Sequence, residues 1–408
     1  MKSSKIRLKL NYRQKLILET LANEHRFLYN HLLDKTKETS DFKELNIFSQ
    51  EYRHTNDLTV YSKSAQNTCR GLIANILSFY ALHKKNDKAK FPHKFKGYKY
   101  FCTFTLDWNN SGGGFKLYDN ILSLRLNHDK NRIDFKLSDY FDSNVINENT
   151  IKTIKFSKDE FDRYFVSFSY SENLSNNNVL DKSDFLSIDI GVDNIATCFS
   201  NKVDPLIIKN NKFKKLERRI EHVQSLRDKK KKRSSRHNRL SKKYRSLNRK
   251  LSNRNKDFQH KASKKIVDIC IENEIGTLII GDIKTKKLIK EYAHGLNKST
   301  QNRGTLSRFK SFLDYKTKSA NIDFYKVNEA YTSQINCLNG KKELSSNLSV
   351  RKVKLCDNIE ISRDLNSAVN IAKKIKAIWL SQYDNFLIST LKNCHEMYID
   401  CSSNLCMI

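Results

Sequence analysis

The chain has 408 residues, and its 76 Lys or Arg residues outnumber 44 Asp or Glu residues, so its formal net charge is +32 at pH 7. This length predicts two or three domains, and a hydrophobic share of 38% supports at least one core, which excludes global disorder. Such an excess of cations indicates a polyanionic partner, because each Lys or Arg that neutralises a phosphate releases a counterion. Nucleic acid is the leading candidate, although an AT-rich genome would also enrich Lys and Asn.

No apolar run approaches the ~20 residues of a membrane span, and the start Met-Lys-Ser-Ser-Lys-Ile is not followed by a signal-peptide core. We therefore expect a soluble, intracellular protein without membrane contact. Nine cysteines, without any Cys-x-x-Cys pair, argue against a disulfide framework. Only 13 residues are Gly or Pro, which favours long regular elements over loops.

The first half of the chain changes from helical to β patterning. Residues 4–10 alternate like a strand, and apolar residues then recur at helical spacing. From residue 89 onward, short alternating runs are separated by turn-forming segments, which predicts a barrel or sandwich that residues 4–10 close. We expect a β-barrel domain from residues 1–11 and 89–178, with a helical domain of residues 12–88 inserted in it.

The second half predicts an α/β domain. A low-complexity segment at 171–184 marks the boundary, and we place the domain at 179–376, followed by a C-terminal tail at 377–408. Three strands precede a long helical stretch that breaks near residue 233, and further strands alternate with helices. This β-β-β-α-β-α-β-α order fits a ribonuclease H-like sheet, in which crossover helices connect parallel strands.

Two carboxylates stand out at the ends of elements in this domain. Asp189 lies in the apolar run of the first strand, where an unpaired carboxylate is costly to bury, so it needs a cation or backbone N–H donors. Asp364 begins a helix whose apolar residues recur at i, i+3, i+4 and i+7, with Ser362 as a candidate N-cap. Helix-start Asp is common for stability alone, whereas Asp193 is better explained as a turn residue.

Five ordered segments of the sequence now point to a family. They are SIDIGVDNIAT, the basic region from RDKKKKRSSRHNR onward, LIIGDIK, VNEAYTSQ and SRDLNSAVNIA. Together they resemble the TnpB (OrfB) family of transposon-encoded RNA-guided nucleases, related to type V CRISPR effectors and Fanzor proteins. The resemblance covers about residues 5–376. It implies a RuvC (ribonuclease H-like) nuclease domain, a wedge-like β-barrel and a helical recognition domain, in a prokaryotic cytoplasmic, nucleoid-associated protein.

The chain departs from this family at the carboxylate site. Most members have a catalytic Glu where this chain has Gly281, and in one branch the acid comes instead from the next strand, where this chain has Glu329. Asp282 is a weaker substitute, because strand alternation turns it to the other face. The resemblance thus implies that Asp189, Glu329 and Asp364 hold two Mg²⁺ ions and are the catalytic residues, while Ser362 replaces an accessory acid. A solvated loop acid is the alternative for Glu329.

The family's zinc ribbon is also incomplete here. The ribbon-like insertion that we expect at 331–362 offers only Cys337 and Cys356, and two thiols cannot form the usual closed tetrahedral site. We therefore expect no structural zinc, and we assign both cysteines to packing.

Residues 212–265 contain 23 basic and only four acidic residues, a net charge of +19. Too few acids are present for the i, i+4 pairing that supports a solvated helix, which favours contact with nucleic acid. Tyr98, Tyr100, Phe101, Trp108 and Phe115 lie among lysines and could stack on bases or fill the core. The residues expected to bind nucleic acid are Lys229, Lys230, Lys231, Lys232, Arg233, Arg236, Arg239, Lys242, Lys243 and Arg245.

The resemblance implies an RNA-guided, Mg²⁺-dependent DNA endonuclease whose partners are a guide RNA and double-stranded target DNA. Gly281 and Ser362 keep a second hypothesis open, a nuclease-dead RNA-guided repressor that binds DNA without cleaving it. A plain transposase is disfavoured, because the family does not itself perform transposition.

Overall fold

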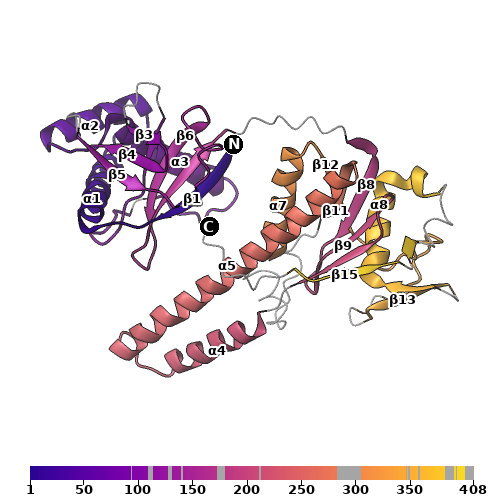
Figure 1. Cartoon of the computed structure of the whole chain (residues 1–408). Coiled ribbons are helices and arrows are strands. Elements are labelled where there is room, and N and C mark those ends of the chain that lie inside the picture. Colours follow the sequence, from indigo (N-terminus) through magenta and orange to yellow (C-terminus); the bar gives the residue numbers. More distant parts are fainter. Residues whose placement is uncertain are drawn as a thin grey trace. The chain divides into compact units, whose positions relative to one another are not determined.

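The computed structural model describes residues 1–92, 94–108, 114–126, 131–138, 141–171, 180–210, 213–282, 305–345, 347, 350–356, 359–381, 390–391 and 393–399. The chain divides into two compact units, built from Met1–Asn173 and Leu174–Leu405 (Figure 1). Within the described residues, no helix is long and apolar enough to cross a membrane.

Three helices of the first unit pack around a core of their own. The first begins with a capping box, in which Asn11 accepts a hydrogen bond from the backbone N–H of Gln14 and the Gln14 side chain accepts one from that of Asn11. Its buried leucines recur at helical spacing, so one face of the helix supplies the core. The helices are α1 (Tyr12–Lys35), α2 (Phe42–Thr55) and α3 (Ser62–His83).

The β part of the first unit consists of two sheets. A four-stranded sheet has the order β1-β7-β6-β2, and a three-stranded sheet has the order β3-β4-β5. The sheets share one apolar core, but the hydrogen bonds of the described residues do not close a barrel, which differs from our expectation. Their strands are β1 (Lys2–Leu8), β2 (Phe104–Asp107), β3 (Phe115–Tyr118), β4 (Ile121–Arg125), β5 (Arg132–Lys136), β6 (Ile151–Lys158) and β7 (Tyr164–Tyr170).

The second unit is built on a six-stranded mixed sheet. Its order is β12-β11-β8-β9-β10-β15, with β8, β11 and β12 parallel to one another and β8, β9 and β10 forming an antiparallel meander. The carboxyl ends of the three parallel strands therefore lie at one edge. The strands are β8 (Asp181–Asp189), β9 (Asn194–Ser200), β10 (Leu206–Lys209), β11 (Ile275–Gly281), β12 (Asp323–Val327) and β15 (His395–Met397).

Helices cover both faces of this sheet. One face packs with α5 and α7, and the other packs with α8, which explains why β11 is apolar throughout its central residues. The connection breaks between α4 and α5, as the sequence predicts, and Arg233 adopts a positive φ of 68° there. The helices are α4 (Lys214–Asp228), α5 (Ser235–Glu272), α7 (Thr305–Ser319) and α8 (Arg363–Ser381).

Two features near the C-terminal end complete the unit. A hairpin of β13 (Lys352–Cys356) and β14 (Ile359–Ser362) lies in the expected insertion and leads directly into α8. The short strand β15, in the segment that we expected to be only a tail, pairs in parallel with β10 and extends the sheet. The chain is thus a multidomain protein of mixed α/β structure.

Candidate metal-binding carboxylate site

Three carboxylates come from elements that meet at one edge of the second unit's sheet. Asp189 is the last residue of β8, Glu329 follows β12 by two residues, and Asp364 lies in the first turn of α8. Each of the three residues is partly accessible, so the group is neither sealed in the core nor fully solvated.

The electrostatics of Asp189 show that these three acids are neighbours. Burial raises the pKa of Asp189 well above its usual value, and the negative charges of Asp364 and Glu329 raise it further. Arg363 and a hydrogen bond from the backbone N–H of Ile190 oppose this rise. Like charges at short range disfavour the ionised form of each carboxyl group, and a bound cation would offset that repulsion.

Glu329 carries an oxygen atom without a hydrogen-bond partner. Burial raises its pKa to about 7, the Lys310 ammonium lowers it and Asp282 raises it. Its Oε2 atom is buried and has no hydrogen-bond partner among the described residues. An unsatisfied buried carboxylate oxygen is costly, and a bound cation would remove that cost.

Gly281 provides the space that the Glu329 carboxylate occupies. A Cβ atom at residue 281 would lie 2.5 Å from Glu329 Oε2 and 3.1 Å from Ile371 Cδ1 of α8. The residue therefore faces the helix that also carries Asp364. The Glu329 side chain thus occupies the space that a side chain at residue 281 would need.

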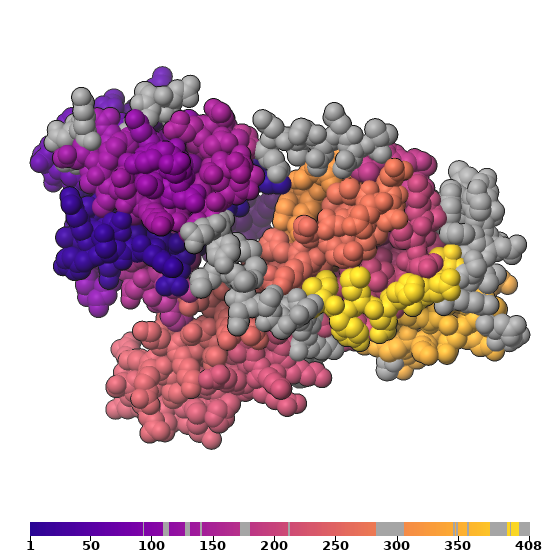
Figure 2. Space-filling model, in the orientation of Figure 1, coloured from indigo at the N-terminus to yellow at the C-terminus, as the bar shows by residue number. Residues whose placement is uncertain are grey.

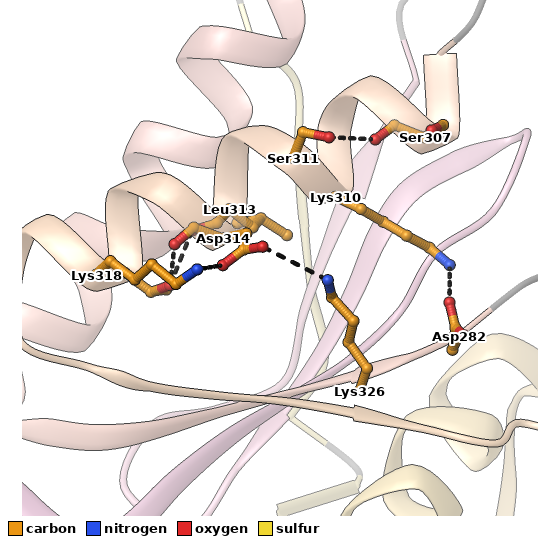
Figure 3. Close-up of polar contacts among 9 residues, drawn as sticks. Asp282, Ser307, Lys310, Ser311, Leu313, Asp314, Lys318 and Lys326 are labelled. Carbon is orange, nitrogen blue, oxygen red and sulfur yellow. Dashed lines mark hydrogen bonds and ion pairs between the residues drawn. The ribbon is translucent and has the colours of Figure 1, made fainter. Parts of the chain in front are cut away.

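Asp282 turns away from this space, as strand alternation predicts. It forms an ion pair with Lys310 of α7, with Lys310 Nζ and Asp282 Oδ1 3.2 Å apart (Figure 3). Its backbone N–H also donates a hydrogen bond to the Val327 carbonyl of β12. Figure 3 shows a separate cluster in which Lys318 and Lys326 both contact Asp314. Asp282 therefore pairs with Lys310 on α7 and does not join the three acids at the end of the sheet.

Three asparagines form hydrogen bonds around the three acids; two of them belong to the RD-N-A-N pattern that begins at Arg363, to which the sequence assigned no separate role. The Asn194 side chain donates a hydrogen bond of 2.7 Å to Asp364 Oδ2. On α8, the side chains of Asn366 and Asn370 each donate to the carbonyls of Thr332 and Ile335. These bonds attach the segment that follows Glu329 to the helix that carries Asp364. The signal in the sequence was a pair of Asn residues at i and i+4 beside an apolar helix face.

The residues present are suited to a hard divalent cation. Carboxylate oxygens are the ligands that Mg²⁺ prefers, and the unpartnered Oε2 of Glu329 is an available donor. In its present arrangement, however, the described part of the chain contains no group of three or more His, Cys, Asp or Glu side chains that could hold a metal ion. The acids would have to move closer together on binding.

The predicted nucleic-acid-binding residues lie between α4 and α5 and in the first half of α5. Of the ten, Lys230 is half-buried and the others are exposed to solvent, so their ammonium and guanidinium groups are accessible. The two helices pack on each other, and the Arg227 guanidinium lies over the Tyr244 ring at 4.6 Å from its centroid. Figure 2 shows this basic helical pair as a continuous surface in the pink range of the colour bar.

The two cysteines of the insertion have different environments. Cys337 is fully buried in the core that α8 covers, which agrees with a packing role, whereas Cys356 on β13 is exposed and does not pack. Both are free thiols.

We expect purified protein to contain far less than one zinc ion per chain, because two separated thiols cannot form a closed tetrahedral site. Elemental analysis measures this directly. Stoichiometric zinc that disappears when Cys337 and Cys356 are both changed to Ser would contradict the prediction and indicate ligands elsewhere in the chain.

Two models of known protein families match separate parts of the chain. The OrfB_IS605 family model, described as "Probable transposase", matches residues 167–287, and the model "Cas12f1-like, TNB domain" matches residues 307–371. A comparison with curated protein sequences gave no significant match.

One solved structure shares the fold of this chain over most of its length. The structure titled "Cryo-EM structure of the Cas12f1-sgRNA-target DNA complex" aligns with a TM-score of 0.58 and 15% identity, over 89% of this chain and 83% of that chain. A CRISPR-Cas12f ternary complex aligns with a TM-score of 0.39 and 15% identity, over 87% and 80% of the two chains. The two family matches agree with the resemblance that the sequence motifs indicated: residues 167–287 are similar to OrfB-type proteins, and residues 307–371 are similar to the TNB domain of Cas12f1-like proteins.

Proposed function

We propose that this protein is an RNA-guided, Mg²⁺-dependent DNA endonuclease with a RuvC-type nuclease domain. The observation that carries the proposal is the electrostatic effect of Asp364 and Glu329 on Asp189, together with the buried, unpartnered Oε2 of Glu329. Such a group is expensive to maintain in a folded protein unless a cation binds there.

Asp189, Glu329 and Asp364 would hold two Mg²⁺ ions. When bound, the ions would activate water and stabilise the leaving 3′ oxygen during cleavage of a phosphodiester. The protein's own residues orient the ligands: Asn194 fixes one Asp364 oxygen, and Lys310 lowers the pKa of Glu329 and keeps Asp282 paired. Arg363, buried beside Asp189, favours its ionised form.

The domains have separate roles in this proposal. Residues 1–11 and 89–178 form a wedge-like β domain, residues 12–88 a helical recognition domain, and residues 179–376 the nuclease domain with its insertion at 331–362. The related Cas12f1 structure is a complex with a guide RNA and target DNA, and we propose the same two classes of partner for this chain. Base pairing with the guide would read the target sequence, while the protein would read the shape of the heteroduplex.

The basic segment at residues 212–265 supplies contact with the nucleic acid backbone in this proposal. Changing Lys229, Lys230, Lys231, Lys232 and Arg233 together to Gln should weaken binding to all sequences about equally. It should also flatten the dependence of affinity on salt, because each lost phosphate contact removes about one unit of the log–log slope. Titrations of full-length protein with labelled duplex at several salt concentrations measure the slope, and an unchanged slope would remove this segment from the interface.

A nuclease-dead repressor remains the second candidate, favoured by one observation. The acids of the described residues do not form a ready metal-binding group in their present arrangement. Both candidates bind guide RNA and DNA, so binding alone does not separate them.

Purification of the full chain with its copurifying RNA provides the test. Sequencing of that RNA identifies the guide, and a matching duplex is then incubated with the complex in Mg²⁺ or in EDTA. Cleavage in Mg²⁺ that EDTA abolishes supports the endonuclease. Guided binding without cleavage at any divalent metal concentration would establish the repressor, and the absence of a specific copurifying RNA would contradict both.

A further inference from the structure

The aromatic residues that lie among lysines in the first unit differ in their environment. Phe115 is 1% exposed, and Phe101 and Trp108 pack against the same apolar core, so these three stabilise the fold. Tyr98 and Tyr100, in contrast, are 75% and 50% exposed. The nearby Phe95 is 59% exposed, which gives three solvent-facing aromatic rings within six residues of chain.

Side-chain contacts hold this segment in place. The Asn30 side chain on α1 accepts a hydrogen bond from the backbone N–H of Lys96 and donates one to its carbonyl, at 2.8 and 3.0 Å. Lys96 Nζ lies 3.3 Å from the centroid of the buried Tyr29 ring and 5.4 Å from that of Tyr100. A turn follows, in which the backbone N–H of Tyr100 donates to the Gly97 carbonyl at 2.9 Å. The rings are therefore presented by an anchored segment.

The surroundings of these rings are cationic. Between residues 84 and 100 the chain has one acid, Asp87, and Lys99 Nζ lies 5.3 Å from the centroid of the Tyr98 ring. A surface of exposed aromatic rings interspersed with lysines has the composition of a site that stacks unpaired bases while its cations track the phosphates. The exposed lysines are Lys84, Lys85, Lys88, Lys90, Lys94 and Lys99.

We propose that Phe95, Tyr98 and Tyr100 form a stacking platform for single-stranded RNA, anchored by Asn30 and Lys96. This inference rests on the proposed function for its choice of RNA, because a guide offers unpaired bases before it meets a target, whereas the bases of duplex DNA are already stacked. Stacking would tolerate any sequence, since every base has a π face.

The test uses the full chain and a 12-nucleotide uridine RNA, without guide, target or divalent metal. Changing Phe95, Tyr98 and Tyr100 together to Ala should weaken binding by about tenfold or more, given the usual cost of losing stacked aromatics. The slope of affinity against salt should stay unchanged, because no charge is removed. The matched control is Tyr118→Ala: Tyr118 is similarly exposed but donates a hydrogen bond to Asp134, so its loss should leave the affinity unchanged.

Three outcomes would overturn the proposal. The triple variant could bind the uridine RNA as tightly as the wild type does, or the Tyr118 control could lose as much affinity as the triple variant. In the third outcome, the triple variant would lose affinity for a deoxythymidine oligonucleotide but not for the RNA. Photo-crosslinking of the unmodified protein to an iodouridine RNA gives a second, independent measurement. Crosslinks within residues 95–100 are expected, and crosslinks confined to other segments would contradict the platform even if the triple variant failed to fold. Because neither assay requires cleavage, a failed platform and a failed nuclease proposal give different results.

Discussion

Glu329→Gln is expected to abolish Mg²⁺-dependent cleavage while it leaves guided DNA binding nearly unchanged. The substitution keeps the size of the side chain but removes the charge of the unpartnered Oε2 atom. Bound metal ions supply several kcal/mol of transition-state stabilisation, so the cleavage rate should fall by roughly 10³-fold or more. Single-turnover cleavage of a guide-matched duplex measures the rate, and gel-shift titration measures the binding.

Asp282→Asn is the matched control for this variant. Asp282 lies close enough to influence Glu329, but its side chain pairs with Lys310 and it does not face the space in front of Gly281. We expect only a small change in the cleavage rate. If Asp282→Asn abolished cleavage and Glu329→Gln retained it, the assignment of the third carboxylate would be reversed.

The free energy of unfolding of Glu329→Gln shows whether a loss of cleavage comes from the site or from misfolding. Without metal, the carboxylate destabilises the fold because burial removes its hydration and its Oε2 atom lacks a hydrogen-bond partner, and the attraction of Lys310 offsets only part of this cost. The neutral Gln should therefore leave the free energy of unfolding equal or higher in EDTA. Mg²⁺ should stabilise the wild type against unfolding more than it stabilises the variant, because ligand that binds the native state adds to its stability.

Local sequence patterns were sufficient to predict strands β8 to β12 of the second unit and helices α4, α5, α7 and α8. The apolar run that ends in Asp189 becomes a buried strand, and the break between α4 and α5 falls where serines follow the lysine run. The parallel neighbours β11 and β12 also followed from the order of elements, since a crossover helix returns the chain beside the preceding strand. These predictions depend on interactions that are near in sequence or on general topological rules.

Long-range pairing explains what could not be predicted. The three-residue strand β15 has no pattern of its own and becomes a strand only because the edge of β10 is available for it. In the first unit, the alternation of polar and apolar residues identifies strands but does not specify which strand edges pair. For this reason the sequence did not show that the strands form two sheets rather than the closed barrel that we expected. The role of Asn366 and Asn370 was hidden for the same reason, because their partners Thr332 and Ile335 are more than 30 residues away.

Gly281→Ala is expected to impair cleavage strongly, although it adds only a methyl group. The new Cβ would lie 2.5 Å from Glu329 Oε2 and 3.3 Å from Glu329 Cβ, so it restricts where the carboxylate can lie when the acids come together around a metal ion. A misplacement of about 1 Å at a reacting centre can cost 10²-fold in rate. Guided DNA binding should persist, and the Mg²⁺ concentration required for half-maximal cleavage should rise because the ligand is displaced.

Two other glycines provide controls. Gly71 on α3 has open space beside it, with no neighbouring atom within 4 Å of the position that a Cβ would take. Gly71→Ala should therefore leave cleavage unchanged and stabilise the helix by about 0.5–1 kcal/mol. Gly276 lies on the same strand as Gly281, but a Cβ there would meet the backbone oxygen of Asp181 at 2.5 Å, so Gly276→Ala should lower stability without a selective effect on the metal requirement. Loss of cleavage in Gly276→Ala equal to that in Gly281→Ala would indicate a general strand defect.

The reciprocal exchange tests whether residue 281 faces the site. Gly281→Glu alone should be inactive, because its side chain competes for the space that Glu329 occupies, and Glu329→Gly alone should be inactive because a ligand is lost. The double variant places one carboxylate on β11 and frees the space in front of it, so it should cleave faster than either single variant. Such a gain is a positive coupling between neighbouring positions, which independent sites do not show. The double variant could fold and bind the guided target but cleave no faster than Glu329→Gly. That result would contradict the claim that side chains at these two positions place a carboxylate in the same space.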